Sequence, residues 1–268
     1  MEHPPLVKKD TLRIFVGTDE SQRIPTKVLE YSIRKFATCE VELHQMEDLR
    51  IPVPKEPENR PKTRFSFYRF MIPKLAGYSG RAVYMDADMQ VFSDVSELLE
   101  RPMNGKYVQC SFQDSFPEAW TGNPHFSHGR QLSVLVLDCN KLDWVIEKIV
   151  AGLDRGDYTY KELMEDLCIM APEKIGDDLP AEWNHLEMHE AGKTKLTHYT
   201  VIATQPWKNP KNPLIDIWLK DFEECVALGL IGWSEISDAI EKGFIAPYLG
   251  DYFPEGKRCR ADPLVRLR

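Results

Sequence analysis

The chain has 268 residues, of which 28% are charged and 43% hydrophobic, and its formal net charge is −8. This length and composition are typical of one large α/β domain, or of a domain with a helical appendage. The acidic balance argues against a general nucleic-acid binder, because such proteins usually present a basic surface to the phosphate backbone.

Hydropathy and cysteine spacing also argue against a membrane-spanning, secreted or disulfide-rich protein. No apolar run approaches the roughly 18 residues that a membrane-spanning helix needs. Residues Met1 to Pro5 lack the charged and apolar regions of a signal peptide. The six cysteines are scattered and include no C-x-x-C pair. We therefore expect reduced thiols in a cytoplasmic protein rather than a disulfide framework.

The apolar run Leu12 to Val16 predicts the first strand, which ends at Gly17, Thr18 and Asp19. Parallel α/β sheets bind ligands at the carboxyl ends of their strands, where a small residue lets a flat base approach and a carboxylate accepts a hydrogen bond. The same triplet is also a good turn and helix N-cap. Classical dinucleotide binding is not indicated, because no G-x-G-x-x-G motif follows the strand.

The most informative stretch is the predicted buried strand Arg81 to Met85, followed by Asp86, Ala87 and Asp88. Extended geometry aims residues i and i+2 the same way, and a kink after the strand would also let both carboxylates turn toward one point. Two such carboxylates repel each other unless a cation lies between them, and Mg²⁺ or Mn²⁺ suits oxygen ligands. The alternative is a solvated acidic turn.

The remaining pattern alternates helices with strands and contains no internal repeat. A proline-rich loop spans Ile51 to Pro61. Further helices are predicted at Arg64–Leu75, Lys141–Leu153, Tyr160–Met170, Leu214–Leu228 and Ser234–Lys242, and further strands at Val41–His44, Tyr107–Phe112 and Leu132–Asp138. Asp94 and Glu97 fit a helix cap and its partner, and Ser234 is a plausible cap of the last helix.

Two segments could contact partners. The loop from Phe112 to Arg130 carries Trp120, His125 and His128, which could stack on and bind an acceptor, or could belong to a loosely packed insertion. The last residues form a basic tail that either contacts anionic lipid headgroups or is a solvated terminus. Its cationic residues are Lys257, Arg258, Arg260, Arg266 and Arg268.

The stretch from Arg64 to Glu100 resembles the retaining glycosyltransferases of family 8, which include glycogenin and bacterial lipopolysaccharide galactosyl- and glucosyltransferases. The resemblance rests on a Tyr-Arg pair in a helix, a strand ending in Asp-x-Asp and the segment from there to Glu100. It implies a GT-A fold, which is an α/β fold with a mixed, mostly parallel sheet flanked by helices. We expect a catalytic domain over residues 10–210 and a C-terminal helical appendage with the basic tail over residues 211–268.

The resemblance also implies a set of site residues. Asp86, Asp88 and His198 would bind Mn²⁺ or Mg²⁺, although a lone histidine would otherwise more often be structural. Arg69 would lie near the donor sugar, where the alternative is a structural salt bridge. The residues implied to bind the nucleotide are Gly17, Thr18, Asp19, Asp86, Ala87, Gln205 and Lys208.

Three positions depart from the family pattern. Gln131-Leu132-Ser133 stands where relatives usually have Asn-Ser-Gly, and Gln131 can still donate to a sugar hydroxyl. Met164-Glu165-Asp166 stands where relatives often have Asp-Gln-Asp, so Asp166 keeps the second carboxylate, Met164 loses the first and Glu165 replaces the glutamine. Glu165 and Asp166 are candidates for the retaining chemistry or for an ordinary helix face. Gln205 replaces the lysine that contacts the diphosphate, and Lys208 could substitute for it.

The implied function is metal-dependent, retaining transfer of a hexose from UDP-glucose or UDP-galactose to a glycan or lipid-linked glycan acceptor. We expect a cytoplasmic enzyme, with peripheral contact to the inner face of a membrane as an option through the basic tail. One alternative is a nucleotide-sugar-binding module that has lost transfer. The other is a sugar nucleotidyltransferase, whose Gly-rich, Arg-containing loop is not found after the first predicted strand.

Overall fold

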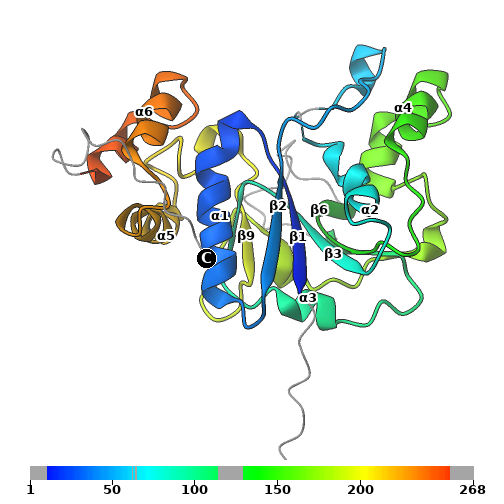
Figure 1. The fold of residues 1–268 in the computed structure, drawn as a ribbon, viewed down its shortest axis with the longest axis horizontal. Helices are drawn as coiled ribbons and strands as arrows, with labels where there is room; N and C mark the ends of the chain where they lie inside the picture. Colours follow the sequence, from blue (N-terminus) through cyan, green and yellow to red (C-terminus); the bar gives the residue numbers. More distant parts are fainter. Residues whose placement is uncertain (1–10, 62, 64, 114–128, 254–268) are drawn as a thin grey trace, which may run out of the picture.

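The computed structural model describes residues 11–61, 63, 65–113 and 129–253. Within them, the largest sheet has six strands in the order β2-β1-β3-β6-β5-β7 (Figure 1). The strands are β1 Leu12–Gly17, β2 Val41–Met46, β3 Arg81–Asp86, β5 Val108–Gln113, β6 Gly129–Asp138 and β7 Ile175–Gly176. Four consecutive residues of β3, Ala82 to Met85, are fully buried, as expected for a strand covered on both faces.

The sheet is mixed. β1 pairs in parallel with β2 and β3, β6 runs antiparallel to both β3 and β5, and β5 pairs in parallel with β7. In the β1–β3 register Gly17 lies opposite Asp86. The carboxyl ends of β1 and β3 therefore meet at one edge of the sheet.

A smaller sheet stands beside this edge, in the order β4-β9-β8. Its strands are β4 Met89–Val91, β9 Leu196–His198 and β8 His185–Leu186. Met89 pairs with His198, and the backbone N–H of Tyr199 donates to the carbonyl of Asp88 at 2.8 Å. This pairing brings His198 next to the acidic turn, although the two segments are far apart in sequence.

The helices lie around the sheet as Figure 1 shows, with α1 at one side of the strands, α5 and α6 beyond α1, and α2 and α4 at the opposite end of the view. Their bounds are α1 Arg23–Phe36, α2 Ile72–Leu75, α3 Ser96–Glu100, α4 Ile146–Arg155, α5 Ile215–Ala227 and α6 Trp233–Glu241. In the part of the chain that the structure describes, no helix is long and apolar enough to cross a membrane.

The C-terminal helices share a core with the first helix. Ile24 and Val28 of α1 belong to the same buried cluster as Trp207, Trp218 and Phe222. The helical appendage expected after residue 210 is thus packed against α1, while the boundary itself stays a prediction. The basic tail, and with it the predicted membrane contact, lies outside the described residues, as do Trp120, His125 and His128.

Two helix predictions were wrong in extent. The predicted helix from Arg64 to Leu75 is a 3₁₀ turn, Tyr68–Met71, followed by α2. Pro73 has no N–H to donate to an earlier turn, so it is tolerated only in the first turn of α2. The helix predicted to reach Met170 ends in a π-helical turn, Glu162–Asp166, because Leu167 enters the core in a left-handed conformation.

Two helix starts also differ from the prediction. α4 begins at Ile146 rather than Lys141, because Lys141 still belongs to the turn after β6, where its N–H donates to Asp138. α6 is capped at Gly232 rather than Ser234, because the Glu235 carboxylate accepts the Gly232 N–H at 3.0 Å.

Candidate metal centre

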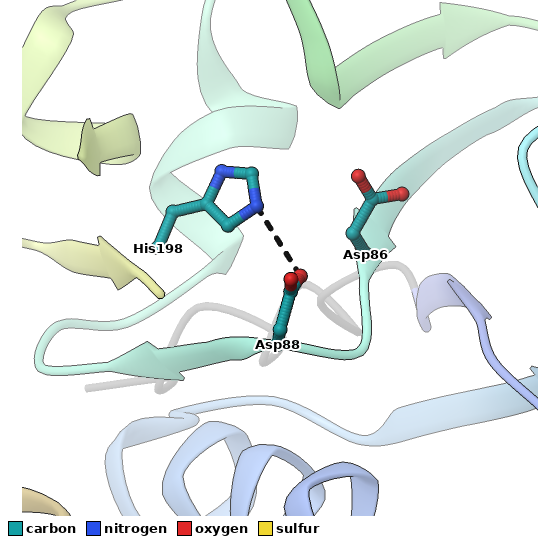
Figure 2. Close-up of side chains that lie close together, drawn as sticks. All are labelled: Asp86, Asp88 and His198. Carbon is teal, nitrogen blue, oxygen red and sulfur yellow. Dashed lines mark ion pairs between the residues drawn. The ribbon is translucent and has the colours of Figure 1, made fainter. Parts of the chain in front are cut away.

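Asp86, Asp88 and His198 lie together at the carboxyl edge of the large sheet, with one ligand atom from each within 4.8 Å of the others (Figure 2). Asp86 is the last residue of β3, Asp88 follows the bend, and His198 ends β9. Ala87 is fully buried, and its N–H donates to the carbonyl of Gly17 at 3.0 Å, which fixes the bend against β1. The predicted grouping is confirmed.

Asp86 is held by two buried side chains. Tyr84, two residues earlier on the same face of β3, donates a short hydrogen bond to Asp86 Oδ1, and Arg69 Nη2 lies 3.3 Å from the same oxygen. Arg69 is 5% exposed and also donates from Nε to the carbonyl of Ser66 and from Nη1 to that of Leu132. Burial raises the pKa of Asp86, and the Arg69 guanidinium opposes that rise.

Gly17 makes room for this arrangement. A Cβ atom at Gly17 would lie 2.5 Å from the Tyr84 hydroxyl and 3.1 Å from the Phe65 ring. The absence of a side chain is therefore required by the tyrosine that supports Asp86, which is a different reason from the approach of a base. A nucleotide contact at Gly17 stays a prediction.

Thr18 and Asp19 have the local partners expected of a turn. Thr18 is fully buried, and its hydroxyl lies 2.7 Å from that of Thr26. Asp19 Oδ1 accepts hydrogen bonds from the N–H and the hydroxyl of Ser21, so it caps the short helix that follows. The turn and cap interpretation is confirmed, and a uridine-binding role stays a prediction.

Asp88 faces His198 and Gln205. His198 Nε2 lies 3.2 Å from Asp88 Oδ1, and Gln205 Nε2 donates to Asp88 Oδ2 at 3.2 Å. Gln205 is fully buried and donates a second hydrogen bond to the carbonyl of Tyr199 at 2.8 Å. The amide of Gln205 is therefore directed at the metal-site carboxylate, while Lys208, in the next turn, is half-buried.

His198 is enclosed by groups that the sequence did not single out. Its Nδ1 lies 3.1 Å from Asn184 Oδ1, and its neighbour Glu187 accepts the N–H of Val201 at 2.7 Å. Burial lowers the pKa of His198, but the carboxylates of Asp88, Asp86 and Glu187 together outweigh burial and raise it. Neither Asn184 nor Glu187 was predicted from the sequence, because both contacts depend on how separate segments pack.

These residues fit a divalent cation. Asp88 Oδ1 is buried and accepts no hydrogen bond from any residue that the structure describes, although an imidazole nitrogen lies beside it. A cation would bind this oxygen and offset the repulsion between the two carboxylates. Two carboxylates with one imidazole suit Mn²⁺ better than Mg²⁺, because imidazole is a nitrogen ligand.

The other predicted site residues lie outside this cluster. Glu165 is half-buried and lines a cavity of about 590 Å³ with Tyr160 and Lys161, among others. Tyr160 also interacts electrostatically with Arg69, and Arg69 is the residue that contacts Asp86. Asp166 is exposed at the end of the π-helical turn, and Gln131 is half-buried in β6. Their roles at the sugar stay predictions.

Comparisons with known proteins find similarity to glycosyltransferases. The model of the family "Glycosyl transferase family 8" matches residues 7–132. Protein CDI of Arabidopsis thaliana is 28% identical over 238 residues, covering 81% of this chain and 88% of the relative. Galactinol synthase 1 of Ajuga reptans is 25% identical over 190 residues, 57% of this chain and 54% of the relative. The chain thus spans about half the length of that synthase.

Solved structures share the fold at low identity. The galactosyltransferase LgtC, in complex with donor and acceptor sugar analogues, is 12% identical with a TM-score of 0.56 over 80% of this chain and 96% of LgtC. The glycosyltransferase GlyE of Streptococcus pneumoniae is 13% identical with a TM-score of 0.58 over 88% and 65%. The fold is the predicted GT-A fold, and residues 7–132 of the chain are similar to glycosyltransferase family 8.

Proposed function

We propose that the chain is a retaining, metal-dependent glycosyltransferase that moves a hexose from UDP-glucose or UDP-galactose to a glycan or lipid-linked glycan acceptor. The observation that carries the proposal is the convergence of Asp86, Asp88 and His198 at the carboxyl edge of the sheet in a chain similar to glycosyltransferase family 8. A bound Mn²⁺ or Mg²⁺ supplies a Lewis acid that neutralises charge on the leaving diphosphate.

The protein prepares its ligands before any cation arrives. Arg69 and Tyr84 both contact Asp86 Oδ1, so one carboxylate oxygen is fixed and the other is left to a ligand. Gln205 does the same for Asp88 by holding Oδ2, which leaves Oδ1 facing His198. Because these supports are buried and hydrogen-bonded, little reorganisation is needed when a substrate with a diphosphate binds.

The donor would lie along the same edge. Gly17 ends β1 directly opposite Asp86, and Thr18 and Asp19 follow it, which supports their proposed contact with the uridine. Since the Gln205 amide is occupied by Asp88 and Tyr199, we assign the diphosphate contact to Lys208 in preference to Gln205. For the sugar we propose Arg69 and Gln131.

Glu165 and Asp166 are our candidates for the sugar-facing step of retention. Glu165 is the stronger of the two, because it lines the cavity of about 590 Å³ whereas Asp166 is exposed. Retention requires either a double displacement or attack on the same face as the leaving group. UDP-galactose is the first donor to test, because several relatives are named galactinol synthases.

A second function is favoured by one observation. Gln205 stands where the resemblance implies a lysine on the diphosphate, and its amide is turned to Asp88. A protein with less positive charge beside the diphosphate could bind a nucleotide sugar without transferring it. Such a binding module would hold UDP-sugars and Mn²⁺ but release no UDP.

The test is to incubate the protein with UDP-galactose or UDP-glucose and Mn²⁺, with and without EDTA, and to measure UDP release and UDP-sugar binding. Transfer predicts UDP release that EDTA abolishes. Binding without UDP release supports the binding module instead. Neither binding nor release with any UDP-sugar, while another nucleotide class binds, would overturn both.

A further inference from the structure

The cavity of about 590 Å³ beside Glu165 is bounded by two separate parts of the chain. The proline-rich loop contributes Glu58 and Asn59, and the segment around the π-helical turn contributes Thr159 to Lys161, Met164 and Glu165. Its volume falls in the range of roughly 300–1,000 Å³ that small-molecule sites occupy. None of the metal-cluster residues lines it, so it offers room for a ligand other than the cation.

This cavity adjoins the support of the metal cluster through Arg69. Arg69 Nη2 lies 3.3 Å from Asp86 Oδ1, and Arg69 also interacts electrostatically with Tyr160, which lines the cavity. The ring of Tyr160 packs near that of Phe67, two residues before Arg69, with the ring centroids 5.9 Å apart. The cavity therefore borders the residues that hold Asp86, where a second substrate would have to lie to reach a donor bound at that carboxylate.

The proline-rich loop is a fixed wall of the cavity rather than a loose connector. The Lys55 N–H donates to Asp154 Oδ1 at 2.8 Å, and both residues of α4 that the loop contacts lie in its last turn. Asn59 Nδ2 donates to the carbonyl of Leu153 at 3.5 Å. Arg60 donates to two carbonyls of the loop itself. Because this wall is in place before a ligand binds, binding has less ordering to achieve.

The facing wall includes the π-helical turn Glu162–Asp166. Such turns are rare and often occur at functional sites. Leu163 and Leu167 of this segment enter the core, while Glu165 lines the cavity. Lys161 Nζ lies 3.8 Å from Glu165 Oε2, one helical turn along. The turn thus presents a carboxylate to the cavity with an ammonium group beside it.

The lining carries more negative than positive charge. Its carboxylates are Glu58 and Glu165, and Lys161 is the single cation among the described residues that line it. Since Lys161 is already near Glu165, the charge of Glu58 is the one left without a balancing cation. Glu58 is exposed and forms no ion pair with any residue that the structure describes.

The other lining groups suit a sugar. Asn59 adds an amide, Thr159 and Tyr160 add hydroxyl groups, and Met164 adds apolar surface. Sugar hydroxyls can donate to carboxylates and accept from amide and hydroxyl donors, as serine and threonine hydroxyls do. A sugar acid or a sugar phosphate would instead bring a second negative charge close to Glu58, and like charges repel.

We propose that this cavity holds the acceptor and that Glu58 makes it selective for a neutral sugar over a sugar acid or a sugar phosphate. The inference rests on the proposed function, because an acceptor is needed only if the chain transfers a sugar. It also gives the proline-rich loop a role in choosing the substrate. The loop supplies the unbalanced carboxylate, and its hydrogen bonds to α4 keep that carboxylate at the cavity.

The experiment compares two sugars that differ only at C6, methyl glucoside and methyl glucuronide, and the matching galactose pair. Their dissociation constants are measured by NMR titration with UDP and Mg²⁺ present. Wild-type protein should bind the neutral glycosides more tightly than the uronides. Glu58→Gln should lower this preference by about 2–5-fold, the size of one exposed charge interaction, and Glu58→Lys should lower it further. Because Glu58 is exposed, neither change should disturb folding.

The matched control is Glu147→Lys, which makes the same charge change at an exposed position of α4 outside the lining. It should leave the preference unchanged. A preference that Glu58→Lys does not alter, an equal shift in Glu147→Lys, or no binding of any of the four glycosides by wild-type protein overturns the inference.

UDP release, measured in parallel, separates this inference from the proposed function. If UDP is released but the preference does not depend on Glu58, the proposed function stands and the selective acceptor cavity is refuted. If no UDP is released while neutral glycosides bind and Glu58→Lys shifts the preference, the proposed transfer fails and the cavity remains a site selective for neutral sugars.

Discussion

Asp88→Asn removes one charge from the metal cluster while preserving the shape of the side chain. The new amide can accept the Gln205 N–H with its oxygen and donate to His198 Nε2 with its NH₂ group, across the two contacts of 3.2 Å that the carboxylate makes. The hydrogen bonds of the folded protein are thus kept, but the lone pair that a cation would use at His198 is consumed. We therefore expect the change to remove two metal ligands at once.

The expected effect on stability is small. Two unit charges 4.8 Å apart, the widest separation within the cluster, repel by about 3.5 kcal/mol at an effective dielectric constant of about 20. Removing Asp88 relieves this repulsion on Asp86 and also removes the attraction of Asp88 for His198, and the two changes largely offset each other. The free energy of unfolding should change by about 1 kcal/mol or less, as for exchanges that leave no buried group unpaired.

The assay compares urea unfolding, Mn²⁺ binding with UDP, and UDP release for wild type, Asp88→Asn and Asp143→Asn. Asp143 is an exposed residue before α4, so the same chemical change there should alter none of the three. For Asp88→Asn we expect normal unfolding with Mn²⁺ binding and UDP release lost. Full UDP release by that variant, or by wild type in EDTA, would show that the cluster is not a metal site.

Three further outcomes follow from the packing. Gly17→Ala should destabilise the fold by about 1–3 kcal/mol, because its Cβ would meet the Tyr84 hydroxyl at 2.5 Å; an unchanged urea midpoint would contradict this. Asp221→Ala should lower the free energy of unfolding by about 1–3 kcal/mol, because it removes a buried partner of Lys35 at 2.9 Å. Glu224→Ala removes a more exposed partner of Lys35 and should lower it by at most about 1 kcal/mol. Equal losses in the two variants would refute this difference. Mn²⁺ and UDP together should raise the melting temperature more than either alone, because each binds better when the other is present, and scanning calorimetry checks this.

Strands and helices were predictable where the pattern is local. β1 and β3 are short apolar runs that are buried on both faces, so their existence and place could be predicted from hydropathy. The Asp-x-Asp turn predicted a cation because two adjacent carboxylates repel each other unless a positive charge lies between them. The family resemblance, not spacing, supplied His198, since its position depends on the pairing of β4 with β9.

What could not be predicted depends on contacts between distant segments. The requirement for glycine at position 17 is visible only once the hydroxyl of Tyr84 is placed beside it. The helix predicted from Arg64 contains a proline whose effect was overlooked, and the support of His198 by Asn184 depends on a hydrogen bond between segments 14 residues apart. The requirement for glycine at position 17 and the contact of Asn184 with His198 are tertiary effects that no local pattern encodes, whereas the proline was a local signal.

The orientation of Gln205 changes how charge must be balanced during transfer. A lysine here would add a cation beside the two carboxylates, but the neutral amide adds none and spends its donors on Asp88 and Tyr199. Arg69 is already committed to Asp86 by its ion pair. In the proposed transfer, charge on a leaving UDP would then be balanced mainly by the divalent cation, with Lys208 as the proposed helper. We infer that transfer by this chain would depend more steeply on the metal than it would with a lysine at position 205.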